Sequence, residues 1–120
     1  MTTMELLQTY PIASVKVKGW FMEKMLNTLK DDTIPEEFKD YVRQQGIEDE
    51  KLANIVGDNP RALFDVFDDN EIFIDVIFDH EHRVFRYSFD GNVESINYTL
   101  RKDAEADAVA EAFKLLNEEV

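Results

Sequence analysis

The spacing of apolar residues changes near residue 71, from a period of about 3.6 to a period of 2. Before this point apolar side chains recur at helical spacing. After it they alternate with polar side chains in three runs, at about 71–79, 83–90 and 93–100. Alternation at period 2 is typical of half-buried strands. The sequence therefore predicts an N-terminal run of helices followed by a three-stranded antiparallel β-meander.

The first long helix is predicted to be continuous from Pro11, with Thr9 as its cap. Its interior contains Lys18 and Gly19, which weaken the pattern, so the alternative is an extended segment before a helix that begins near Trp20. For the continuous helix, the apolar stripe comprises Ile12, Val15, Met22, Leu26 and Leu29.

A second helix is predicted over about 35–45. A capping box formed by Thr33 and Glu36 precedes it, and Gly46 suits its far end. Shorter helices are expected over about 48–56 and from Pro60 onward. The side chains that we expect the 35–45 helix to bury are Phe38, Tyr41 and Val42.

The turn between the second and third runs sets their register. A two-residue loop of residues 91–92 places Tyr87 opposite Ile96 and Phe85 opposite Tyr98, which keeps the aromatic side chains on one face. An Ala-rich helix over about 103–118 follows, with an apolar stripe of Ala106, Val109, Ala110, Phe113 and Leu116. We therefore expect one α+β domain over residues 1–120, in which the C-terminal helix packs on the sheet.

Acidic residues dominate the charge of the chain. There are 26 Asp and Glu against 13 Lys and Arg, which gives a net charge of −13. The clearest basic cluster lies in the first thirty residues and comprises Lys16, Lys18, Lys24 and Lys30. Because a nucleic-acid-binding protein needs a basic footprint, we expect no direct contact with nucleic acid. A basic protein is the expected partner.

Cysteine usage and hydropathy indicate the compartment. The chain contains no cysteine, so it has neither a disulfide framework nor a thiol site. The first ten residues lack the features of a secretory signal, and the apolar-rich stretch 12–29 is interrupted by three Lys and one Glu. We expect a cytoplasmic protein that does not enter a membrane.

The cluster Asp79-His80-Glu81-His82 holds the residue types that bind metals. On an extended chain, histidines at i and i+2 point the same way, but a closed zinc site needs four ligands and these are the only histidines. The stretch 65–81 holds seven acids without matching a calcium loop, and acids also keep edge strands from pairing. No phosphate loop or nucleophile elbow is present. We therefore expect no metal, no cofactor and no enzymatic activity.

The second face of the sheet carries an apolar spot with a polar rim, which is typical of an interface. The alternative is that the N-terminal segment covers this face. Trp20 is a further candidate for partner binding because, on a continuous helix, its side chain points away from the apolar stripe. The alternative, which is the more common case for tryptophan, is that the ring packs against a neighbouring side chain. The candidate partner-binding residues are Trp20, Phe73, Asp75, Ile77, Val84 and Arg86.

Charge and candidate surface together predict a protein-binding module that acts on a basic partner. Small acidic inhibitors have this character, including immunity proteins and mimics of nucleic acid. One alternative is a metal-dependent hydrolytic enzyme that uses the cluster at 79–82. Another is a structural or assembly subunit that forms a homodimer through the outer sheet face.

Overall fold

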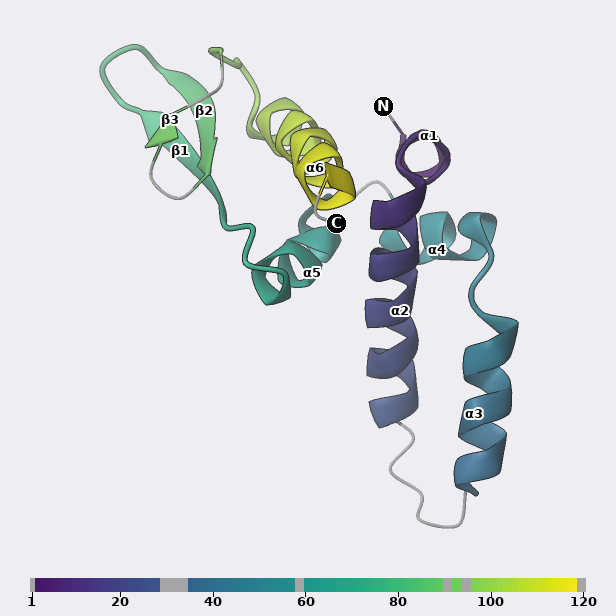
Figure 1. Ribbon diagram of the computed structural model, residues 1–120. Helices are drawn as coiled ribbons and strands as arrows, with labels where there is room; N and C mark the ends of the chain where they lie inside the picture. The colour runs from purple at the N-terminus through teal and green to yellow at the C-terminus, as the bar shows by residue number, and fades with distance from the viewer. Residues whose placement is uncertain (1, 29–34, 58–59, 90–91, 94–95, 119–120) are drawn as a thin grey trace.

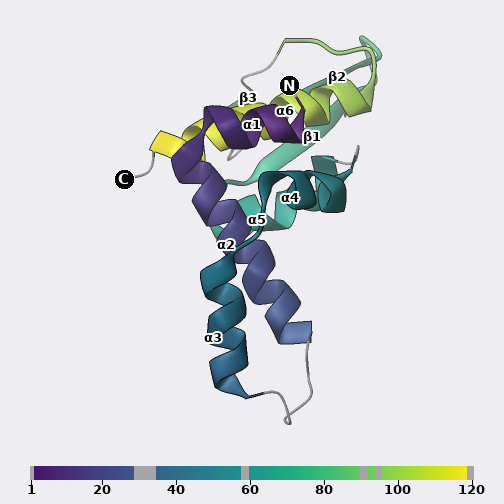
Figure 2. The same ribbon diagram turned by 90° about the vertical axis from the view of Figure 1, so that its right-hand side faces the viewer.

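The computed structural model describes residues 2–28, 35–57, 60–89, 92–93 and 96–118. Figure 1 shows the order of the elements, which are α1 (Thr3–Thr9), α2 (Pro11–Thr28), α3 (Glu36–Gln45), α4 (Asp49–Val56), η1 (Pro60–Leu63), α5 (Phe64–Asp69), β1 (Ile74–Asp79), β2 (Val84–Phe89), β3 (Asn92–Val93) and α6 (Arg101–Glu118). The molecule is elongated, measuring 56 × 27 × 25 Å. Figure 2 shows the cause: α2 and α3 run side by side away from the sheet and α6.

The α+β class is correct, but the three-stranded meander is wrong. Strands β1 and β2 form an antiparallel ladder that runs from the Ile74–Phe89 pair to the Asp79–Val84 pair. Strand β3 pairs at two positions only, and residues 96–100 make one isolated bridge between Phe85 and Tyr98. In the described part of the chain, the sheet is thus a two-stranded hairpin with a short addition.

A change of register explains why no full third strand forms. Ser88 pairs with Val93, whereas Phe85 pairs with Tyr98. Two residues separate 85 from 88 on β2, but four separate 93 from 98, so a regular ladder cannot join the two pairings. The Phe85–Tyr98 pairing matches the predicted register, but the predicted loop of residues 91–92 is wrong, because Asn92 pairs with Phe89 in the ladder. Gly91 of the predicted turn lies outside the described residues.

The third run also fails to bury its apolar side chains. Ile96 and Leu100 are exposed, and Tyr98 is half-buried. The Tyr98 hydroxyl donates a hydrogen bond of 2.7 Å to Asp107 Oδ2 on α6. One aromatic side chain therefore fastens this segment to α6 without continuous strand pairing.

Helix α2 is continuous through Lys18 and Gly19, as predicted, but its buried side differs from the expected stripe. Ile12 and Val15 are exposed. The side chains buried on α2 are Ala13, Ser14, Val17, Met22 and Leu26, while Leu29 lies outside the described residues. The start of α2 is fixed by α6, because Asn117 Oδ1 accepts hydrogen bonds from the backbone N–H groups of residues 12 and 13, at 2.9 and 3.2 Å. This contact places the small Ala13 against α6 and turns Val15 to solvent.

Helix α1 was not predicted. Thr2 and Glu5 form a capping box, in which each side chain accepts a hydrogen bond of 3.2 Å from the other residue's backbone N–H. Leu6 and Leu7, which follow directly, are both buried. The signal was present in the sequence as Thr-x-x-Glu before an apolar pair.

Helix α3 has the predicted bounds but not the predicted burial. None of its described residues is buried; Phe38 and Tyr41 are 52% and 59% exposed, and Val42 is half-buried. Instead, Arg43 joins α3 to α2 through a hydrogen-bonded ion pair of 2.8 Å with Glu23. Thr33 of the predicted capping box lies outside the described residues. An ion pair thus joins the two helices, while the rings of Phe38 and Tyr41 remain more than half exposed.

The core forms where α6 meets the shorter helices and the sheet. Phe113 of α6 packs edge-to-face on Phe67 of α5, with ring centroids 5.5 Å apart. Small side chains on α6 are fully buried and allow close approach of its neighbours; these are Ala104, Ala108 and Ala112. The other side chains buried on α6 include Val109 and Leu116 of the predicted stripe.

Across the residues that the structure describes, no helix is both long enough and apolar enough to cross a membrane.

Candidate partner-binding surface on the β-hairpin

The β1–β2 ladder brings five of the predicted site residues to one face. The pairings of Asp75 with Ser88 and of Ile77 with Arg86 put their side chains on the side opposite the aromatic residues that face α6. Phe73 and Ile77 are 48% and 47% exposed, so the described helices leave much of both side chains uncovered. We call this surface the outer hairpin face; it comprises Phe73, Asp75, Ile77, Val84 and Arg86.

Trp20 does not belong to this face. It lies on α2, where its indole N–H donates a hydrogen bond of 2.5 Å to Asp69 Oδ2 on α5. Phe21 packs edge-to-face on the ring at 5.0 Å, and the Lys24 ammonium lies 5.1 Å from the ring centroid. Trp20 is half-buried and packed against neighbours, which matches the more ordinary of its two interpretations.

Arg86 serves as a brace within the hairpin. Its Nε donates to Asn97 Oδ1 at 2.9 Å, and its terminal nitrogen donates to Asp79 Oδ2 at 2.8 Å. These bonds hold the 96–100 segment and the end of β1 against β2. Because this guanidinium is already bonded on two sides, Phe73, Asp75 and Ile77 are the more accessible groups of the face.

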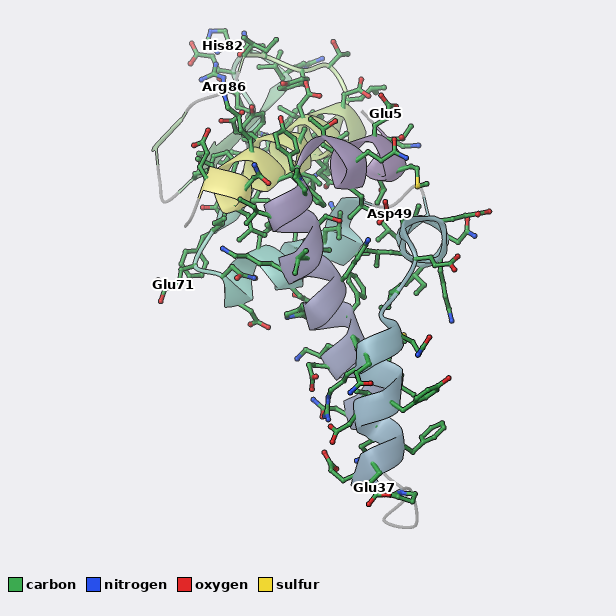
Figure 3. The ribbon with its side chains drawn as sticks, turned by 45° about the vertical axis from the view of Figure 1, so that its right-hand side comes forward. Glu5, Glu37, Asp49, Glu71, His82 and Arg86 are labelled. Atoms are coloured by element: carbon green, nitrogen blue, oxygen red, sulfur yellow. The ribbon has the colours of Figure 1, made fainter. Side chains whose placement is uncertain are left out.

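Asp79 organises the turn between β1 and β2. Its Oδ1 accepts hydrogen bonds from the backbone N–H groups of Glu81 and His82, at 3.0 and 3.2 Å. Its Oδ2 lies 2.9 Å from His82 Nδ1, and Figure 3 shows His82 and Arg86 at this end of the molecule. The bond from the His82 side chain, followed by the His82 backbone bond, lowers the pKa of Asp79.

The two histidines of this turn have different surroundings. His80 packs edge-to-face on Phe78, with centroids 4.7 Å apart, whereas His82 is bonded to Asp79. The expectation that both side chains point the same way is therefore wrong, because the chain turns after β1 instead of staying extended. Among the described residues, no group of three potential metal ligands comes together.

An acidic cluster borders the outer hairpin face. Burial raises the pKa of Asp68, and the charges of Asp65, Asp69 and Asp75 raise it further. The charge of Asp75 on β1 therefore acts on a carboxylate of α5. The sequence showed that the 65–81 stretch is acid-rich, but not that these two charges influence each other. We call these four residues the acidic cluster.

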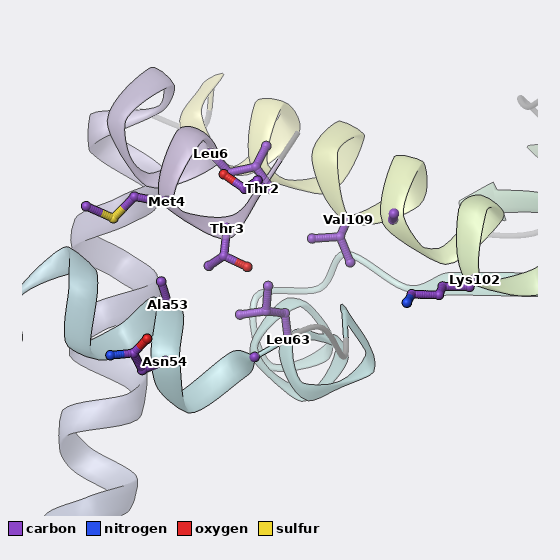
Figure 4. A pocket seen from close by; sticks show the side chains of 11 residues that line it. Thr2, Thr3, Met4, Leu6, Ala53, Asn54, Leu63, Lys102 and Val109 are labelled. Atoms are coloured by element: carbon purple, nitrogen blue, oxygen red, sulfur yellow. The ribbon is translucent and has the colours of Figure 1, made fainter.

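A second surface feature is an open cavity of about 480 Å³ between α1, α4, η1 and α6. Leu6, Leu63 and Val109 contribute apolar walls, and Figure 4 shows Lys102 at one end and Asn54 at the other. Helix α1, the neighbouring pair α4 and η1, and helix α6 are three parts of the chain that lie far apart in the sequence, so no local pattern could have indicated this cavity.

Comparison of the chain with known protein families, with characterised proteins and with solved structures finds no significant match. Function is therefore inferred from the surface itself. Its most distinctive part is the outer hairpin face, where partly exposed apolar side chains adjoin the acidic cluster.

Proposed function

We propose that this protein is a non-enzymatic, cytoplasmic binding module that docks a basic protein on its outer hairpin face. One observation carries the proposal: Phe73 and Ile77, each about half exposed, flank Asp75, which in turn borders the other carboxylates of the acidic cluster. Two partly exposed apolar side chains thus flank a carboxylate whose charge acts on the acidic end of α5.

Each component has a separate physical role. Burial of the Phe73 and Ile77 side chains would contribute affinity, since the apolar core of an interface supplies most of its binding energy. The acidic cluster would select a basic partner, and the net charge of −13 would accelerate its approach. A small acidic protein that binds a basic partner would be analogous to small acidic inhibitors such as immunity proteins and nucleic-acid mimics.

The proposal is tested by capture of proteins from a cell lysate on the immobilised full chain at low and high salt. We expect basic proteins to be enriched at low salt and released as salt rises, because exposed charges are screened. Replacement of both apolar residues, Phe73→Ser with Ile77→Ser, should abolish this enrichment.

The matched control is Ile55→Ser. Ile55 lies on α4 and is 46% exposed, so its replacement matches the Ile77→Ser change in residue type and exposure but lies on another part of the molecule. Capture that is equal for the double variant, the control and the unaltered chain would refute the outer hairpin face as the docking site. Recovery of acidic or neutral proteins only, without salt dependence, would refute the basic partner.

A further inference from the structure

Strand β1 lies at the edge of the sheet. The strand order is β1-β2-β3, so β1 has β2 on one side and no strand of the described chain on the other. An edge strand presents backbone N–H and C=O groups that can pair with another extended chain. Figure 1 shows β1 and β2 as neighbours, with α5 leading into β1.

The hydrogen bonds of β2 determine which backbone groups of β1 face the free edge. Phe85 exchanges two backbone hydrogen bonds with Tyr98, of 2.7 and 2.9 Å, so its N–H and C=O point away from β1. The Phe78–Phe85 pair is therefore a non-hydrogen-bonded pair of the β1–β2 ladder. Bonding alternates along an antiparallel ladder, so the groups of Ile74, Val76 and Phe78 point outward.

In the described chain, no backbone hydrogen bond outside the ladder involves Ile74, Val76 or Phe78. The intervening residue Asp75 and the exposed Phe73 and Ile77 have their side chains on the outer hairpin face. The edge therefore offers regularly spaced donors and acceptors, next to an apolar-acidic-apolar row of side chains.

We infer that the partner binds by adding an antiparallel strand to the free edge of β1, and that this strand presents a Lys or Arg between two apolar residues. The inference rests on the proposed function and specifies the partner's binding segment. Opposite Asp75 the added strand would form a non-hydrogen-bonded pair, in which side chains approach most closely. A cation there would lie near Asp75, and apolar neighbours would cover Phe73 and Ile77.

Charge also argues for a different protein as the occupant rather than a second copy of this chain. In the symmetric antiparallel register centred on Val76, a second β1 would place Ile77 opposite Asp75 and Phe73 opposite Asp79. Neither carboxylate would gain a cation, although both would lose solvent, which is unfavourable. Two molecules of net charge −13 would also repel each other.

The test uses the full chain and a synthetic seven-residue peptide with the sequence Thr-Val-Thr-Lys-Thr-Val-Thr. Titration is followed by the NMR signals of backbone amides, which detect weak binding of a short peptide. We expect the amide protons of Ile74, Val76 and Phe78 to shift most, because they would acquire hydrogen bonds. A peptide with Glu in place of Lys should bind at least about tenfold more weakly.

N-methylation separates strand addition from simple contact with the face. Methyl groups on the Thr amides, which would point toward β1, should abolish binding, whereas methyl groups on the Val and Lys amides should be tolerated. On the protein side, Asp75→Lys should reverse the preference from the Lys peptide to the Glu peptide. The matched control Glu81→Lys changes an exposed turn residue and should preserve the original preference.

The outcomes that would overturn the inference are specific. Absence of binding by all peptides would mean that Asp75 and Asp79 guard the edge instead of recruiting a strand. Equal binding of the two methylated peptides would show docking on the face alone, and dimerisation that excludes the peptide would make a second copy the occupant. The lysate experiment gives its result independently of the peptide titration. A failure of strand addition to β1 therefore does not decide whether the outer hairpin face binds a basic protein.

Discussion

At the scale of single residues, a few polar side chains hold segments that the sheet does not. Asp79 closes the hairpin turn, and Arg86 connects that turn to Asn97. Tyr98 binds Asp107, and buried Glu105 pairs with Arg61 Nε at 2.7 Å. The bonds of Arg86 and Tyr98 hold the 96–100 segment where no full third strand forms, whereas the Glu105–Arg61 pair joins α6 to η1.

Tyr98 gives a prediction about alkaline pH. Burial and the bond to Asp107 raise the pKa of Tyr98 above its ordinary value of about 10. The folded state thus retains the proton that the unfolded state releases, so the stabilisation is complete below pH 10 and is lost as pH rises above it. Tyr98→Phe should lower the melting temperature at pH 7. Between pH 10 and 11, however, the melting temperature of this variant should fall less steeply than that of the unaltered protein. The exposed Tyr41→Phe is the control, and identical alkaline slopes for all three proteins would contradict the prediction.

Ser88 gives a second prediction at this scale. Its side chain is fully buried in β2, and its Oγ has no hydrogen-bond partner among the residues that the structure describes. A buried hydroxyl without a partner retains its desolvation cost. Ser88→Ala should therefore leave the free energy of unfolding unchanged or increase it by up to about 1 kcal/mol. Urea denaturation measures this difference, and a clear destabilisation would show that the hydroxyl is bonded in solution.

At the scale of elements, α3 differs from the rest of the helical half. It contributes no buried side chain, and of the three acids that pair with Arg43, Glu23 lies on α2 whereas Glu36 and Asp40 lie on α3 itself. Exposed ion pairs contribute little to stability, commonly below about 1 kcal/mol. Helix α3 is accordingly expected to be among the least stably packed elements of the fold, whereas α6 lies at its centre.

This difference can be measured by substitution. Phe38→Ser and Tyr41→Ser should each change the free energy of unfolding by no more than about 0.5 kcal/mol, because both rings are already exposed. Phe113→Ala on α6 should cost about 3–5 kcal/mol through the cavity that it creates. Urea denaturation of the three variants distinguishes the cases. Similar losses for all three would mean that the α3 rings are buried in solution.

At the scale of the whole molecule, excess negative charge opposes the fold. The 26 acids outnumber the 13 bases, so at least 13 carboxylates would lack a cationic partner even if every base formed one ion pair. One base can pair with more than one acid, and Arg43 pairs with three. The acidic cluster concentrates part of this excess, as the raised pKa of Asp68 indicates.

Salt should therefore stabilise the protein. Screening weakens repulsion between exposed carboxylates, so the melting temperature should rise between about 10 mM and 150 mM salt at pH 7. Asp68→Asn should raise the melting temperature at low salt and reduce the salt response, since it removes one charge from the acidic cluster. A melting temperature that stays constant or falls over this range would mean that repulsion between carboxylates does not destabilise the fold measurably.

Local sequence signals predicted where the helices begin and end better than they predicted which side chains are buried. Pro11 and the glycines that follow α3 and α4 mark helix ends correctly, and Gly46 and Gly57 adopt positive φ angles of 70° and 61°. The side that each helix buries was less predictable. Val15 and Val17 are chemically alike, yet one is exposed and the other fully buried, because α2 begins against the end of α6.

The sequence alone determined the helix-to-strand change, the pairing of β1 with β2, and the shared face of Phe73, Asp75 and Ile77. These features follow from backbone periodicity, which is local. Only the tertiary structure decided that the third run does not continue the sheet, that α3 exposes its rings, and that the charge of Asp75 acts on Asp68. Burial, edge position and carboxylate proximity depend on contacts between distant segments, and periodicity carries no information about which segments meet.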